Sequence, residues 1–133
     1  MAALIDTSLW IDFTRKRSPQ SLKRFIAPFL LDPEAYLAEP VVFEILRHAT
    51  PAENKQLNQQ FQTLPTLATP VDMWSQAANL GQACRRKNIT VSSMDLLIAW
   101  VALSHGAEVV TFDDDFQKIA SVSNLRVKLL TRP

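Results

Sequence analysis

Four acidic residues occupy positions where a folded chain has no obvious structural need for a charge. Each has an apolar residue on at least one side and no lysine or arginine beside it, and the four are Asp6, Glu44, Asp95 and Asp113. A partly buried carboxylate is costly unless it is hydrogen-bonded, paired with a cation or bound to a metal. These residues are therefore candidates for one site that holds a positive ion.

The ligand types available indicate which ion that site would hold. The chain has one cysteine and two histidines, so it offers no cluster of soft or imidazole ligands. Carboxylate oxygens alone favour a hard cation such as Mg²⁺ or Mn²⁺. Such an ion binds a phosphate, activates a water and offsets charge on a leaving oxygen. The pattern points to phosphoryl chemistry.

Two of the acids directly follow expected strands. A short apolar strand over residues 2–5 ends before Asp6, and a β-branched strand over 108–111 is followed closely by Asp113. The carboxyl ends of parallel strands share one edge of a sheet, and functional groups collect there. We expect these two side chains to lie close together.

The other two acids lie on expected helices. Asp95 is in the first turn of an apolar helix over 92–104, and its i+3 neighbour is Ile98, so its side chain starts the face that packs inward. Glu44 lies on a helix over 41–47. That helix has only to lean over the sheet edge to bring Glu44 to the site.

Strands and helices alternate along the rest of the chain. Further strands are expected at 36–38, 67–68 and 126–130, and further helices at 19–31, 51–63, 70–87 and 113–120, the first of them capped by Ser18. This order predicts an α/β fold, a three-layer α/β/α sandwich with a mainly parallel central sheet, in one domain spanning residues 1–133.

Composition narrows the class of protein. A hydrophobic fraction of 47% and a charged fraction of 20% are typical of a globular domain, and the net charge of +1 excludes binding of nucleic acid through bulk charge. The longest apolar run, 96–103, is far shorter than the ~20 residues that span a bilayer. The start of the chain has no signal-peptide pattern. We expect a soluble, cytoplasmic protein with no membrane partner.

The segments around the four acids resemble the four motifs of PIN-domain proteins, particularly the VapC toxins of toxin–antitoxin pairs. These segments occur in the family order, at residues 4–12, 40–47, 93–99 and 110–116. The first and third are specific, whereas the other two are weak when taken alone. The resemblance implies a PIN fold and a Mg²⁺- or Mn²⁺-dependent endoribonuclease. It also implies a homodimer and an antitoxin partner whose tail covers the acidic site.

The resemblance also implies roles for individual residues. Asp6 and Asp95 would be the principal metal ligands, and Glu44 and Asp113 would complete the shell. Asp115 precedes Phe116 as in the Asp-Phe pair of the family, so it shares or replaces the role of Asp113. Thr7 and Thr111 would orient carboxylates or bound water. Basic clusters at 15–17 with 23–24, and at 85–87, are candidate RNA contacts or simply solvated helix ends.

Each acid also has a purely structural interpretation. Asp6 can cap the helix that follows it, and Ser92 with Asp95 can form a pair like a capping box. Glu44 can reach solvent, and Asp113 can belong to a turn.

Two other functions remain in view for the whole chain. The main alternative is a catalytically silent PIN-like module that binds RNA or protein. A phosphotransferase with Asp6 as nucleophile is disfavoured, because such enzymes need a second aspartate two residues on and position 8 is serine.

Overall fold

Five short strands form one sheet that is parallel throughout. The computed structural model describes residues 1–133 and orders the strands β3-β2-β1-β4-β5. Their bounds are β1 Ala3–Ile5, β2 Ala35–Ala38, β3 Thr66–Leu67, β4 Glu108–Thr111 and β5 Arg126–Leu129. The predicted parallel sheet is confirmed, and the carboxyl ends of β1 and β4 are neighbours because these strands pair directly.

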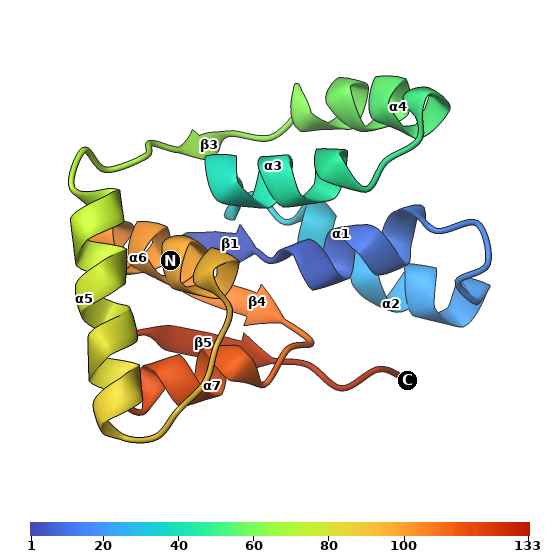
Figure 1. Ribbon diagram of the computed structural model, residues 1–133. Helices are drawn as coiled ribbons and strands as arrows, with labels where there is room; N and C mark the ends of the chain where they lie inside the picture. Colours follow the sequence, from blue (N-terminus) through green and yellow to red (C-terminus); the bar gives the residue numbers. More distant parts are fainter.

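Seven helices surround this sheet (Figure 1). They are α1 Thr7–Thr14, α2 Gln20–Leu31, α3 Glu39–Arg47, α4 Pro51–Phe61, α5 Met73–Arg86, α6 Ser93–His105 and α7 Asp115–Ala120. Helix α6 packs on β4 and on the helices α3, α5 and α7, whereas α2 packs on β2 and α1. This is the predicted three-layer α/β/α arrangement. No helix has the length and apolar character needed to cross a membrane.

Helix boundaries differ from the predictions where prolines and turns intervene. The prediction of Ser18 as N-cap is wrong, because Pro19 takes the N-cap position of α2 and its carbonyl accepts from Leu22 N at 3.1 Å. Helix α5 begins at Met73 rather than Pro70, because the Pro70 carbonyl accepts from Met73 N in a preceding turn. None of these shifts moves an acidic candidate.

Helix α6 is fixed at both ends and along its buried face. The Ser92 side chain accepts a hydrogen bond from Asp95 N, and Gly106 ends the helix in the left-handed conformation, with φ of 62°. Ile98 and Ala99 on this helix have no exposed surface and belong to the core of 27 buried residues. The first turn, which carries Asp95, is therefore held against the sheet.

Truncation of that buried face should be costly. We expect Ile98→Ala to lower the free energy of unfolding by about 3 kcal/mol, because it leaves a cavity in the core. Leu31→Ala, at a side chain that is 80% exposed, serves as control and should change it by less than about 0.5 kcal/mol. Urea unfolding measures both, and equal effects would contradict the packing described for α6.

Candidate functional site

Acidic side chains from α6 and from the segment after β4 converge at the carboxyl edge of the sheet. One carboxylate oxygen each from Asp95, Asp113 and Asp115 lies within 4.8 Å of the other two. Asp95 is buried, and the other two are half-buried. Three oxygens at this separation form a candidate site for a hard divalent cation.

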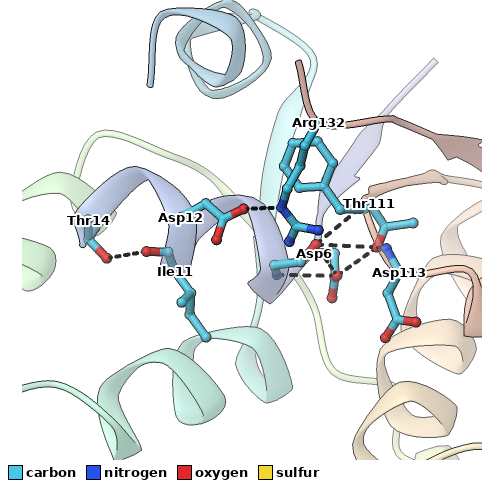
Figure 2. A network of polar contacts seen from close by, with 9 residues as sticks. Asp6, Ile11, Asp12, Thr14, Thr111, Asp113 and Arg132 are labelled. Atoms are coloured by element: carbon cyan, nitrogen blue, oxygen red, sulfur yellow. Dashed lines mark hydrogen bonds and ion pairs between the residues drawn. The ribbon is translucent and has the colours of Figure 1, made fainter. Parts of the chain in front are cut away.

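Asp6 lies at the end of β1 beside this group, and one of its oxygens takes all its hydrogen bonds (Figure 2). Its Oδ2 accepts from Thr111 Oγ1 at 2.8 Å, from Ser8 Oγ at 2.8 Å and from Ser8 N at 3.3 Å. The last bond caps α1, so the structural interpretation of Asp6 holds as well. Oδ1 takes part in none of these three bonds, and Asp6 is not one of the three residues whose oxygens lie within 4.8 Å of one another.

Two hydroxyl groups join the ends of β1 and β4. Thr111 Oγ1 donates to Asp6 and accepts from Asp113 N at 2.8 Å. Ser8 Oγ likewise donates to Asp6 and accepts from Phe112 N at 3.1 Å. Each hydroxyl thus ties the carboxylate that follows β1 to the backbone that follows β4.

Asp113 and Asp115 are both part of the acidic group. Asp113 Oδ1 accepts from Asp115 N at 2.9 Å, a turn that also delays the start of α7 to Asp115. Asp115 pairs with Lys118 at 3.1 Å. Asp113 therefore has its structural role in the turn and still offers an oxygen to the group.

Glu44 lies near the site but outside the group of three. It accepts a hydrogen bond from Thr7 Oγ1 at 2.5 Å, which links α3 to the first turn of α1. Its side chain is half-buried. The hydroxyl of Thr7 therefore holds Glu44 next to the residue that follows Asp6.

The pair of Ser92 and Asp95 forms only half of a capping box. The Asp95 side chain returns no bond to the backbone of Ser92, so its carboxylate remains available to the acidic group. A complete capping box occurs instead at Thr50 and Glu53, at the start of α4. Helix capping therefore explains the hydrogen bond of the Asp95 backbone amide, but it does not explain the buried Asp95 carboxylate.

The environment of the site raises the pKa values of Asp95 and Asp6. Burial, together with the negative charges of Asp113 and Asp6, raises the pKa of Asp95 to about 7. Burial also raises the pKa of Asp6, against the opposing hydrogen bonds from Thr111 and Ser8. Perturbation by burial together with like charges is characteristic of functional carboxylates.

An ion pair that no sequence pattern predicted lies beside the acidic group. The buried Asp12 accepts from Arg132 Nε at 2.6 Å, and the guanidinium lies 4.5 Å from the centre of the Phe112 ring. Asp12 carries the same signal as the four candidates, an acid with an apolar neighbour and no adjacent lysine or arginine, and this signal was sufficient to find it. Nothing local in the sequence identifies Arg132, which lies 120 residues away.

Comparison with known proteins gives matches over nearly the whole chain. A family model described as PIN domain matches residues 3–122. A VapC ribonuclease of Mycobacterium bovis and Ribonuclease VapC11 of Mycobacterium tuberculosis are each 36% identical over 130 residues, which is 92% of this chain and 95% of theirs.

Solved structures show the same fold. VapBC2 from Rickettsia felis, bound to a DNA fragment from its promoter, matches with a TM-score of 0.77 at 16% identity, over 98% of this chain and 100% of that one. VapBC-1 from nontypeable Haemophilus influenzae matches with a TM-score of 0.74 at 17% identity, over 97% and 98%.

The raised pKa of Asp95 gives a pH dependence with a definite sign. Folded protein retains this proton up to about pH 7, whereas the unfolded chain loses it near pH 4, so folding takes up a proton in between. The free energy of unfolding of metal-free wild type should therefore fall as the pH rises through this interval. Asp95→Asn lacks this contribution.

The comparison of the two proteins isolates that contribution. In EDTA, the stability of Asp95→Asn relative to wild type should increase by about 2 kcal/mol between pH 5 and pH 8, after allowance for solvent screening. Urea unfolding at both pH values measures it. A difference that does not change with pH would show that the charge of Asp95 is not destabilising.

Proposed function

This chain belongs to the VapC ribonucleases of the PIN-domain family, and we propose that its acidic group is a Mg²⁺ or Mn²⁺ centre that hydrolyses phosphodiester bonds of RNA. The observation that carries this proposal is the approach of oxygens from Asp95, Asp113 and Asp115 to within 4.8 Å of one another. The ribonuclease activity named for the relatives supplies the reaction class.

The donor set fits a hard cation. All the candidate ligands are carboxylates, and Lys118 is the only basic side chain that pairs with any of the three. Asp95 and Asp6 are proposed as the principal ligands, with Asp113 and Asp115 completing the shell. A bound Mg²⁺ or Mn²⁺ ion supplies the positive charge that attracts the phosphate and activates water.

The remaining polar residues orient these carboxylates. Ser8 and Thr111 both donate to Oδ2 of Asp6, so they fix the orientation of this carboxylate beside the acidic group. Thr7 holds one oxygen of Glu44, and the other is left to bind and orient a water molecule. These hydroxyls act through the carboxylates they contact and are positioning residues.

The relatives also suggest the biological setting. The solved structures of the same fold include proteins described as VapBC and as a member of the VapBC family of toxin–antitoxin systems. The chain is accordingly proposed to be the toxin of such a pair, a homodimer whose partners are RNA and a cognate antitoxin that covers the acidic site.

Substitution of a single ligand tests the site. Asp6→Asn and Asp95→Asn should each lower RNA cleavage at least about a hundredfold, because each removes a charge needed to hold the cation. The matched control is Asp32→Asn, at an exposed aspartate after α2, which should leave the rate unchanged. Cleavage of total cellular RNA is the assay, and full activity of either site variant would overturn the assignment.

Metal removal tests the cofactor separately. EDTA should abolish cleavage, and Mg²⁺ or Mn²⁺ should restore it. The same ions should raise the melting temperature of wild type and leave that of Asp95→Asn nearly unchanged, because only the folded wild-type site binds them. Undiminished cleavage in EDTA contradicts the metal proposal, whereas retention of RNA without cleavage under any metal would favour the silent binding module.

A further inference from the structure

The segment after β5 brings an arginine to the rim of the acidic site. Leu130 N donates to the Thr111 carbonyl at 2.8 Å, so the chain leaves the sheet beside the end of β4. A cavity of about 670 Å³ opens there, and its wall includes Ser8, Asp113 and Arg132. Residues from the two ends of the chain thus line the same cavity as an acid of the site.

Two contacts fix the orientation of the Arg132 guanidinium. Its Nε donates to Asp12 Oδ2 at 2.6 Å, and its Cζ lies 4.5 Å from the centre of the Phe112 ring. Phe112 is itself stacked with Phe25, at 6.3 Å between ring centres and 29° between planes. The Asp12 side chain is only 11% exposed, so the anchor is rigid. Figure 2 shows this guanidinium extending from Asp12 toward the edge that carries Asp6 and Thr111.

The anchored arginine keeps most of its hydrogen-bonding capacity unused. Only Nε donates to the protein, and neither terminal nitrogen has a protein partner. The side chain is 52% exposed. A planar guanidinium held in this way offers paired donors whose geometry matches two oxygens of a phosphate.

The charge of the site explains why such a group is needed. Asp6, Asp95, Asp113 and Asp115 lie together at this edge, and a polyanionic substrate is repelled by any acid whose charge the cation does not offset. The guanidinium lies next to these acids in the same cavity and presents donors to it.

We propose that Arg132 binds a backbone phosphate of the RNA adjacent to the phosphate that is cut, with Asp12 and Phe112 as its positioning residues. The inference rests on the proposed ribonuclease function and adds a substrate-binding residue to it. Arg132 fixes the register of the strand and takes no part in proton transfer.

Binding to an inactive protein tests the contact without cleavage. In the Asp95→Asn background, Arg132→Ala should weaken binding of a random-sequence single-stranded RNA oligonucleotide about tenfold. It should also reduce the slope of log K against log salt by about 0.7, the value for one lost phosphate contact. Arg126→Ala removes the same charge at the opposite end of β5 and should change neither quantity. Equal slopes for the two variants would overturn the proposal.

Steady-state kinetics distinguish a role of Arg132 in substrate binding from a purely structural role. Arg132→Gln retains an amide that can bond Asp12 and loses the charge, so it should raise KM about tenfold and change kcat by less than about threefold. A structural anchor would instead lower the melting temperature and kcat with an unchanged salt slope, and that result would refute the assignment. Absence of cleavage by wild type would refute the proposed function, whereas normal cleavage with an unaffected Arg132→Gln would refute the Arg132 contact alone.

Discussion

Repulsion between carboxylates at one edge of a parallel sheet is the constraint on which the rest of the site depends. Because β1 pairs directly with β4, the residues that follow these strands are brought together whatever their charge. Helix α6 adds Asp95 from the neighbouring layer, where burial and nearby acids raise its pKa to about 7. Ionisation of Asp95 in the metal-free protein is therefore destabilising, and the proposed cation would offset the repulsion among these carboxylates.

The hydroxyl groups around the acids hold the Asp6 and Glu44 carboxylates in place. Ser8 and Thr111 each contact Asp6 and the backbone after β4, so the two strand ends cannot move independently. Thr7, in the first turn of α1, donates to Glu44 and so links α1 to α3. These bonds engage one oxygen of each of these two carboxylates and leave the other available.

Much of the fold and part of the site were predictable from the sequence. The parallel sheet, the family and the position of Asp6 after β1 follow from local patterns, and the first two are confirmed. Local signals did not settle whether Asp113 or Asp115 joins the group, because a turn that ends in the first residue of α7 presents both. The pairing of Asp12 with Arg132 depends on the path of the chain after β5, and no local sequence pattern predicts that path. The starts of α2 and α5 moved because Pro19 and Pro70 lie outside these helices, and the start of α7 moved because Asp113 forms a turn before it.

The proposed divalent cation among these carboxylates can be located directly. Mn²⁺ scatters anomalously, so crystals of the wild-type protein grown with MnCl₂ locate the ion directly. The account predicts an anomalous difference peak in contact with Asp95 and Asp113 and with the free oxygen of Asp6, and the loss of this peak in Asp95→Asn. A well-ordered wild-type crystal with no peak at the acidic group, or with a peak only elsewhere, would contradict it.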